Sequence, residues 1–295
     1  MTEVHYRPES TPSSSDRRRV RALHSLAGVL TRYLLALICA AAFAIPLYWL
    51  AISSLKPTSD IFTFPPDWIP LHPDLGNFVR AWRSAPFARY TLNSVITAVV
   101  GTAGEVSTAC LCAYAFAYLH IPGKRILFGI LLGAMMIPGS VTLLPNFLTV
   151  SDLGWNNTYA GLIVPGFGSV FVTFLMRQHM LGLPREILEA AELEGAGHLR
   201  KLWSVVLPLS RPMLITGGLI TFIYKWNEYI WPLVVTNTDD MRTLQIGLVF
   251  TQATENGADW GIVMAATAFV AGPMLIAYFV AQRHIVAGVL QGAVK

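Results

Sequence analysis

The chain alternates between long apolar runs and shorter polar segments. Each of the long runs reaches the roughly 20 residues that an α-helix needs to cross a bilayer. The runs are Tyr33–Leu55, Leu92–Leu119, Ile126–Leu148, Ala160–Met180, Met213–Val235 and Ile262–Ala281. The pattern therefore predicts an all-α integral membrane protein with six transmembrane helices. Prolines inside the runs predict kinks, because neighbouring helices can satisfy the carbonyls that a proline frees; they are Pro46, Pro138, Pro145, Pro165 and Pro273.

The amino-terminal residues differ in character from these runs. Residues 1–20 are polar and rich in Ser, Pro and Arg, a composition typical of disorder. We expect residues 1–25 to form a disordered basic cytoplasmic tail and residues 26–295 to form a single transmembrane domain. The arginines from Arg17 to Arg21 could begin an export signal, but the apolar run is too long and no small-residue cleavage site follows. An uncleaved first helix and six crossings then place both termini in the cytoplasm.

Composition and charge agree with this topology. Hydrophobic residues make up 54% of the chain and charged residues only 13%, about half of the roughly 25% that is usual in soluble domains. Most basic residues fall in the predicted cytoplasmic segments or at the adjoining helix ends, which is the positive-inside bias. This bias accounts for the net charge of +4 without a nucleic-acid partner. The basic residues predicted outside the cytoplasm are Lys56, Arg80, Arg83, Arg89 and Arg242.

No cofactor or metal is expected on this chain. Cys39, Cys110 and Cys112 each lie in an apolar run without CxxC spacing, which argues against a disulfide framework or a zinc site. The seven histidines are scattered singly. The sole Gly-Lys pair, Gly123-Lys124, lacks the glycine spacing of a phosphate-binding loop, so no ATP site is predicted.

The longest segment predicted inside the cell, residues 181–212, has a helical pattern of its own. Pro184 suits the first turn of a helix, and Glu186 and Glu189 place negative charge near the positive end of its dipole. Apolar residues recur at helical spacing after Pro184. Gly195 is expected to end this helix, because glycine readily takes the left-handed conformation found at helix ends.

A second amphipathic stretch, residues 198–206, leads to Leu207-Pro208 and back to the membrane. The pattern therefore predicts a helix-turn-helix elbow whose tip carries small residues, and small residues let another backbone approach closely. From the residues alone, an elbow that merely returns the chain to the membrane is an equal alternative. The small residues are Ala190, Ala191, Gly195 and Ala196.

This loop resembles the EAA loop of the membrane subunits of binding-protein-dependent ABC importers. The resemblance rests on EAA at Glu189–Ala191, on Gly195-Ala196 and on Leu207-Pro208. The segments NSVITA, AYAFAYL, WNEYIWPL and the terminal GAVK also match, so the likeness extends from Tyr33 onward. It is greatest to the carbohydrate-uptake branch, and within that branch to one of the two maltose permease families. Two positions depart from the family pattern, which usually has Asp at Glu194 and Phe at Leu202.

The resemblance implies a coupling helix that inserts into a surface cleft of a cytoplasmic ATPase subunit. It also implies the partners: a second permease subunit, two ATPase subunits that hold the ATP and Mg²⁺, an extracytoplasmic substrate-binding protein, and the bilayer of a bacterial inner membrane. The chain itself would be a transport subunit and not an enzyme. The coupling residues implied are Glu189, Ala190, Ala191, Gly195, Ala196, Leu207 and Pro208.

Three ionisable residues, Glu105, Lys225 and Glu228, fall within the predicted spans. Each costs about 2.5–3.5 kcal/mol at a helix centre, so such residues normally face a partner or a cavity. Lys225 and Glu228 are three residues apart and can pair on one helix face, or they can line a substrate path. Glu105 lies among small residues, which are typical of tight helix packing, so we expect it to bond to a neighbouring helix rather than to a ligand.

The family resemblance places the fifth apolar run near the translocation path. Trp226 and Trp231 would offer stacking faces to a sugar there. The candidate residues of the substrate path are therefore Glu105, Lys225, Trp226, Asn227, Glu228 and Trp231.

The expected function is ATP-driven uptake of a sugar or oligosaccharide, with this chain forming half of the path. The same machinery could carry glycerol-3-phosphate or glycerophosphodiesters, but a phosphorylated substrate favours arginine in the path and the spans offer only Lys225. A secondary transporter is a further alternative, although it usually shows internal repeats, and none is evident. A membrane-embedded enzyme would need a cluster of catalytic groups at the membrane face, and the sequence suggests none.

Overall fold

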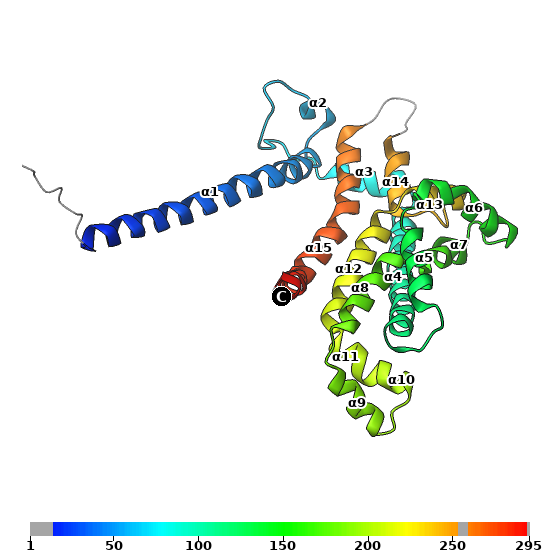
Figure 1. Ribbon diagram of the computed structural model, residues 1–295. Helices are drawn as coiled ribbons and strands as arrows, with labels where there is room; N and C mark the ends of the chain where they lie inside the picture. Colours follow the sequence, from blue (N-terminus) through cyan, green and yellow to red (C-terminus); the bar gives the residue numbers. More distant parts are fainter. Residues whose placement is uncertain (1–13, 253–258, 294–295) are drawn as a thin grey trace, which may run out of the picture. The chain divides into compact units, whose positions relative to one another are not determined.

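The computed structural model describes residues 14–252 and 259–293, and its regular elements over these ranges are all helical (Figure 1). The chain divides into two compact units, Met1–Ile52 and Ser53–Lys295, where a single domain over residues 26–295 was expected. The first unit is built on α1 (Ser14–Ser53). Because α1 begins at Ser14, the disordered tail predicted for residues 1–25 is helical over residues 14–25; residues 1–13 lie outside the described residues.

The second unit contains every later element. In chain order these are α2 (Thr58–Ile61), α3 (Gly76–Ser84), α4 (Phe87–Tyr118), α5 (Lys124–Ala134), α6 (Gly139–Asp152), α7 (Tyr159–Ile163), the 3₁₀ segment η1 (Val164–Phe167), α8 (Val170–Leu181), α9 (Arg185–Leu193), α10 (His198–Lys201), the π-helical segment η2 (Leu202–Val206), α11 (Leu207–Leu209), α12 (Arg211–Asn227), α13 (Ile230–Val235), α14 (Leu244–Gln252) and α15 (Trp260–Ala293).

Helix α4 is the central element of this unit and packs against α8 and α12 (Figure 1). Its buried residues recur every three or four positions, so they line one face of the helix. Most of them are small, which allows neighbouring helices to approach closely. The buried run includes Ser94, Ala98, Gly101, Glu105 and Ala109. Glu105 is thus a large polar residue on a face of small ones.

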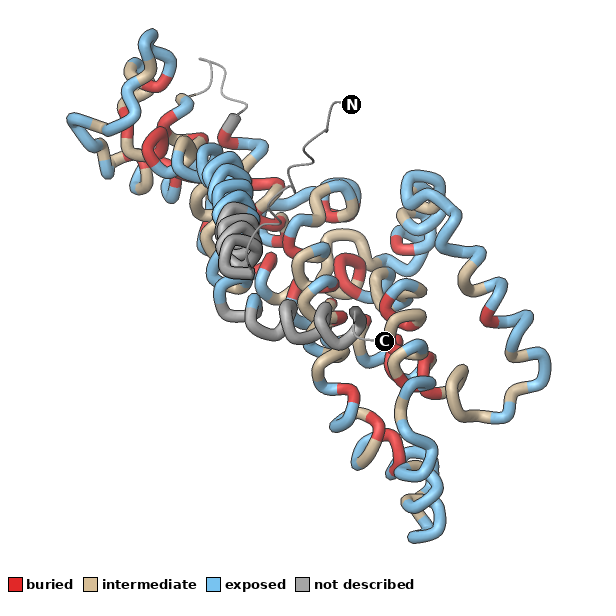
Figure 2. The backbone as a smooth tube through the Cα atoms, turned by 60° about the vertical axis from the view of Figure 1, so that its left-hand side comes forward, coloured by how far each residue is buried: buried red, intermediate tan, exposed pale blue. Residues whose placement is uncertain are grey.

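The buried side chains form three clusters, which Figure 2 shows as red segments along the central helices. One joins α4 and α8 to η2, and includes Met176 and Val206. A second joins α3, α4, α12, α14 and α15 around Phe87 and Trp226. A third joins α6, α7 and α13 around Val150. The elbow formed by α9 to α11 is mostly exposed.

Polar contacts hold the segment that precedes α2 against α3. The buried Asn77 side chain donates to the carbonyls of Ser54 and Lys56, at 3.0 and 2.8 Å. Asp74 accepts from Arg80 at 2.7 Å and from the Gly76 N–H at 2.8 Å. The Arg80 bond, followed by the Gly76 bond, lowers the pKa of the Asp74 carboxyl below its ordinary value.

The third predicted span, Ile126–Leu148, is wrong as a single helix. It consists of α5 and α6, which meet at an angle of 97°. Pro138 stands at the junction and takes an extended conformation at the amino end of α6. A residue before proline is disfavoured in the α region, so the helix stops near Met135 rather than kinking.

The fourth predicted span, Ala160–Met180, is also interrupted. Helix α7 continues into η1, and α8 begins only at Val170 after a bend of 44°. Gly168 and Ser169 between them are extended. The Ser169 hydroxyl then accepts from the Val172 N–H at 3.3 Å and caps α8.

The fifth predicted span, Met213–Val235, breaks at Glu228. Helix α12 ends at Asn227, Glu228 is extended with ψ 124°, and α13 begins at Ile230. Pro232 explains the break, because a proline ring clashes with the carbonyl four residues earlier, which here belongs to Glu228. The single helix expected there is therefore wrong.

The number of membrane spans lies between three and six. Within the described residues, Gly28–Ser53, Phe87–Tyr118 and Trp260–Phe279 are each long and apolar enough to cross a membrane. The number reaches six if each of three bent pairs is one span. The expectation of an all-helical membrane protein is confirmed, while six straight helices are not what the structure has.

A close contact between α4 and η1 gives a test of this packing. A Cβ on Gly104 would lie 2.2 Å from the Phe167 ring. Gly104→Ala should therefore destabilise the protein by about 1–3 kcal/mol, the usual cost of overpacking. The matched control is Gly129→Ala on α5, where a Cβ meets nothing within 4 Å. Thermal unfolding in detergent measures both, and equal melting temperatures would contradict the contact; Phe167→Leu should rescue Gly104→Ala.

Candidate functional site

The elbow begins with α9 and ends its first helix as predicted. Gly195 has a φ of +78°, the left-handed conformation. Its N–H donates to the Glu192 carbonyl and the Ala196 N–H donates to the Ala191 carbonyl, both at 2.9 Å. These are the two bonds of a Schellman motif, which satisfies the last carbonyls of a helix. The predicted stop at Gly195 is therefore confirmed.

The returning half of the elbow contains a π-helical segment that the sequence pattern did not reveal. The Leu207 N–H donates to the Leu202 carbonyl, five residues back. Pro208 has no N–H and its ring crowds the carbonyl of Ser204, so the turn widens before the proline. The chain then bends by 81° between His198–Leu209 and Arg211–Asn227.

The elbow is seated on α4 and α8. Leu202 and Val206 are buried in the cluster that contains Met176. The Tyr114 hydroxyl of α4 lies 3.3 Å from His198 Nδ1. Lys201 Nζ pairs with Glu192 at 3.2 Å and thereby joins α10 to α9. The elbow is therefore attached to these two helices through both apolar and polar contacts.

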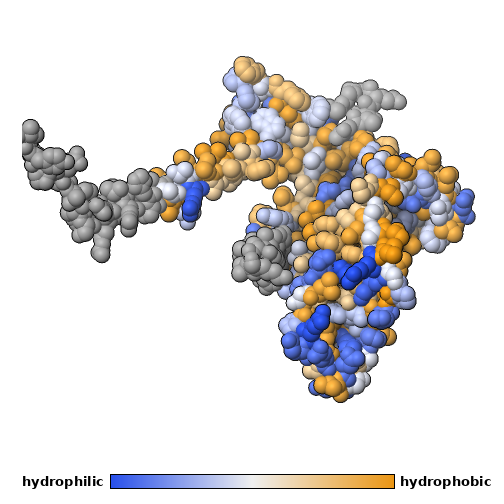
Figure 3. Space-filling view, in the orientation of Figure 1, coloured by the Kyte–Doolittle hydropathy of each residue, from blue (hydrophilic) through white to orange (hydrophobic). Residues whose placement is uncertain are grey.

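The outer surface of the elbow combines polar and apolar residues. Figure 3 shows hydrophilic residues gathered over the elbow, with hydrophobic residues at its tip. Leu193 is 91% exposed and Trp203 is 67% exposed. Of the predicted coupling residues, Glu189, Ala190, Gly195 and Pro208 are exposed, while Ala191, Ala196 and Leu207 are partly buried.

A second candidate site is a cavity of about 380 Å³ bounded by α4, α6, α8, α12 and the breaks between helices. Its lining is mostly polar in character, with hydroxyl, amide, carboxyl and ammonium groups beside an indole. The side chains that line it include Glu105, Thr142, Asn146, Ser169, Tyr224, Lys225, Glu228 and Trp231. The sequence prediction included four of these, and the structure brings the four together.

Glu105 and Lys225 form an ion pair across α4 and α12. Lys225 Nζ lies 3.0 Å from Glu105 Oε2, and the two side chains are 9% and 12% exposed. Lys225 also donates to the Gly166 carbonyl at 3.2 Å, and Thr221 donates to Glu105 Oε1 at 3.4 Å. The expected bond from Glu105 to a neighbouring helix is confirmed.

Glycines make room for the lysine. A Cβ on Gly101 would lie 2.8 Å from Lys225 Cδ, and one on Gly166 would lie 2.6 Å from Nζ. The lysine side chain therefore lies in a slot between α4 and η1. An alanine at either glycine would intrude on it.

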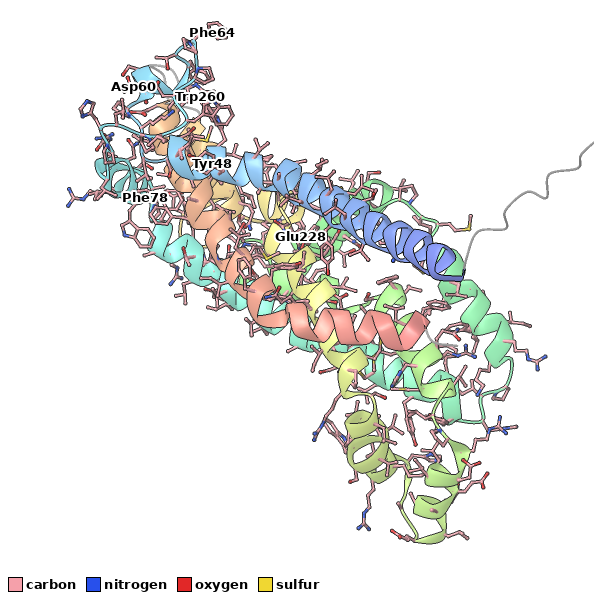
Figure 4. The ribbon with its side chains drawn as sticks, turned by 90° about the vertical axis from the view of Figure 1, so that its left-hand side faces the viewer. Tyr48, Asp60, Phe64, Phe78, Glu228 and Trp260 are labelled. Atoms are coloured by element: carbon pink, nitrogen blue, oxygen red, sulfur yellow. The ribbon has the colours of Figure 1, made fainter. Side chains whose placement is uncertain are left out.

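Glu228 does not pair with Lys225, which corrects one of the two alternatives for these residues. Among the described residues, Glu228 forms no ion pair within 4.0 Å. The helix breaks at Glu228, so the two side chains do not share a helix face, and Lys225 reaches Glu105 instead. Figure 4 shows Glu228 between the end that carries Phe64 and Trp260 and the elbow.

Two of the predicted path residues lie away from the cavity. Trp226 is 1% exposed and its Nε1 donates to the Val270 carbonyl on α15 at 3.2 Å, so the expected stacking face is wrong for this residue. Asn227 is exposed, donates to the Ile223 carbonyl at 2.8 Å, and borders a separate lateral cavity. Trp231 does line the main cavity and donates to the Gly161 carbonyl at 3.0 Å.

The sequence analysis missed the lining residues of α6 and of the break before α8. Thr142, Asn146 and Ser169 lie in runs that were predicted as continuous helices. A signal did exist, because Pro165, Gly166 and Gly168 come close together in an apolar run. Closely spaced prolines and glycines mark breaks, and a break at membrane depth must face protein or a water-filled cavity.

The ion pair yields a stability test. Lys225→Met should destabilise the protein by about 3–5 kcal/mol, because it leaves a buried carboxylate without its partner. Glu105→Gln should also destabilise it, and the double variant should recover most of the loss. Denaturant unfolding in mixed micelles measures the coupling energy. The control cycle pairs Lys225→Met with Glu228→Gln; a larger coupling there would contradict the assigned pairing.

Comparison with known proteins identifies the family. Residues 105–291 match the family described as the binding-protein-dependent transport system inner membrane component. The sn-glycerol-3-phosphate transport system permease protein UgpE of Yersinia pestis is 33% identical over 252 residues, which cover 83% of this chain and 90% of the relative. The probable ABC transporter permease protein YurM of Bacillus subtilis is 32% identical over 261 residues, 86% of this chain and 84% of the relative.

Solved structures share the fold. A bacterial ABC transporter involved in the import of the acidic polysaccharide alginate matches with a TM-score of 0.78 and 24% identity, over 93% of this chain and 99% of that chain. A bacterial alginate ABC transporter in complex with an alginate pentasaccharide-bound periplasmic protein matches with a TM-score of 0.61 and 14% identity, over 92% of this chain and 97% of that chain. The EAA resemblance is thus confirmed: this chain belongs to the multi-pass inner-membrane permease subunits of binding-protein-dependent ABC importers, which transport and do not catalyse.

Proposed function

We propose that this permease subunit forms half of the path for a neutral sugar or oligosaccharide, and that its elbow couples the path to a cytoplasmic ATPase. The observation that carries the substrate class is the lining of the 380 Å³ cavity. Its one cation, among the described lining residues, is already paired with Glu105. Hydroxyl, amide and indole groups remain, which suit a polyhydroxylated neutral molecule.

A second candidate is an anionic cargo such as glycerol-3-phosphate. The observation in its favour is the name of the relatives that are 33% identical. Against it, the cavity carries Glu105, Lys225 and Glu228, one positive and two negative formal charges. A phosphate group is usually held by arginine or lysine, and a cation for it would have to come from the second permease subunit.

The proposed coupling rests on the exposed tip of the elbow. Leu193 and Trp203 are large apolar side chains with little cover, and such surfaces commonly mark sites of protein contact. The family implies the partners: a second permease subunit, two ATPase subunits that bind ATP and Mg²⁺, and an extracytoplasmic binding protein. In this arrangement the elbow lies in the cytoplasm with both termini, and this chain binds no cofactor.

Uptake by the complete transporter tests the substrate class. We expect proteoliposomes that contain both permeases, the ATPases and the cognate binding protein to accumulate a neutral sugar from a labelled panel. Glycerol-3-phosphate should neither accumulate nor compete, because the cavity offers it no unpaired cation among the described residues of this chain. Accumulation of glycerol-3-phosphate without any neutral sugar would exclude the proposal. Liposomes without ATP serve as the control.

Two glycines at the tip test the coupling role. Gly195→Val places a branched side chain at a φ of +78°, which costs about 1–2 kcal/mol of backbone strain, and should abolish ATPase docking or coupled uptake. Gly197→Val is the matched control, because Gly197 has a φ of −68° and equally open surroundings. Glu189→Ala should weaken docking less than Gly195→Val, since it keeps the backbone.

Co-purification of the ATPase and ATP-dependent uptake are the measurements for these variants. Insertion and pairing with the second permease should stay intact, because the elbow lies outside the apolar helices. Normal uptake by a complex that carries Gly195→Val would show that the elbow is not the coupling element.

A further inference from the structure

The cavity contains three ionisable groups that do not have the same freedom. Lys225 Nζ donates to the Gly166 carbonyl at 3.2 Å and pairs with Glu105 at 3.0 Å. Its stem lies in the slot left by Gly101 and Gly166. A lysine held by two oxygen acceptors and tight walls is not available to bind an anionic substrate. Glu105 is likewise occupied, because it accepts from Thr221 as well as from Lys225.

Glu228 is the group left to act on a substrate. In the described part of the chain its side chain forms no ion pair and no hydrogen bond. It lies at the break between α12 and α13, where the backbone is extended. Non-helical backbone at membrane depth is tolerated where it lines a water-filled cavity. The position of this carboxylate therefore points to the path for the same reason as its chemistry does.

Three cavities meet at Glu228. It borders the main cavity of about 380 Å³ and the lateral cavity of about 570 Å³. It also borders a small cavity of about 10 Å³, near the size of one water molecule. Trp231 lies beside it on the wall of the main cavity. A molecule that passes through the main cavity meets this carboxylate and this indole on one wall.

A carboxylate has two acceptor oxygens and no donor when it is ionised. It therefore matches vicinal hydroxyls of a sugar, which are donors, and it repels carboxylate and phosphate groups, which are not. Charge-assisted hydrogen bonds are roughly twice as strong as neutral ones, and like charges placed together in a site suppress wrong partners. One side chain can thus favour neutral cargo and exclude anionic cargo.

We propose that Glu228 is a specificity-determining residue of this transporter, binding hydroxyls of a neutral sugar and excluding substrates that carry a carboxylate or phosphate. The inference rests on the proposed function and adds the residue that sets the charge of the substrate. Lys225 and Glu105 then have a separate role: they fix α12 against α4 and so hold Glu228 at the cavity wall.

The test uses the purified complex of both permeases and the ATPases without the binding protein, so that only the path selects. Isothermal titration compares three matched pairs of probes: glucose with glucuronate, galactose with galacturonate, and mannose with mannuronate. Each pair differs at C6, as a hydroxymethyl group or a carboxylate. We expect the wild-type complex to bind at least one neutral member better than its uronate.

Glu228→Gln should then reduce that preference at least about tenfold, since it removes the charge and keeps the size of the side chain. Glu228→Asp should retain the exclusion of the uronate while weakening the neutral sugar, because the charge stays but the reach is shorter. If Glu228→Gln does not assemble, Glu228→Asp decides the question by the same ratio. Asp152→Asn is the matched control, an exposed carboxylate on α6 that does not line the cavity, and it should leave the ratio unchanged.

The outcomes separate the two proposals. A wild-type complex that binds a neutral sugar, together with an unchanged ratio in Glu228→Gln, overturns the role of Glu228 and leaves the proposed function standing. A Glu228→Asp variant that accepts the uronate as well as the neutral sugar overturns it in the same way. A wild-type complex that binds none of the neutral members and prefers the uronates overturns both.

Discussion

The ion pair between Glu105 and Lys225 is the interaction on which the arrangement of the central helices depends. Neither charge is stable alone in an apolar environment, so α4 and α12 must bring the two together. The approach is possible because Gly101 leaves room for the lysine stem and because the neighbouring residues on that face of α4 are small. Packing and charge therefore impose the same register on the two helices. A shift of one turn would leave a lysine and a glutamate buried without partners.

The same constraint governs where the helices break. A backbone group that leaves a helix within a membrane must find another partner or water. The breaks at Gly168–Ser169 and at Glu228 both border the 380 Å³ cavity. The Lys225 ammonium spans them, because it is attached near the end of α12 and donates to the Gly166 carbonyl. The cavity thus collects the polar backbone and polar side chains that the apolar surroundings cannot accommodate.

The features that the sequence predicts well are those set by local chemistry. Apolar length identified membrane helices, and the glycine at position 195 marked the end of α9 because few other residues tolerate its φ of +78°. Hydrophobicity does not show where a helix stops inside an apolar run, so the bends at Pro138 and Glu228 were missed. The partner of Lys225 was undecided for the same reason, since a pair at i and i+3 requires that the helix continue. Direction around a helix was also undetermined: Trp226 and Trp231 both looked suitable for stacking, but only Trp231 lines the cavity, because an apolar run that is hydrophobic on all sides does not show which face meets α15.

The elbow and the cavity lie at opposite ends of α12, and this connection gives the proposed coupling a physical route. The helix runs from Arg211, next to the elbow, to Asn227, beside the break, a length of about 25 Å at 1.5 Å per residue. A helix of this length moves as a rod, so a displacement of the elbow must shift Lys225 relative to α4 or carry α4 with it. The buried ion pair opposes the first movement, since separating it costs more than moving a packed helix pair. Under the proposed coupling, α4 and α12 would therefore move as one body, and the breaks at their edges, where no helical hydrogen bonds are lost, would take up the motion.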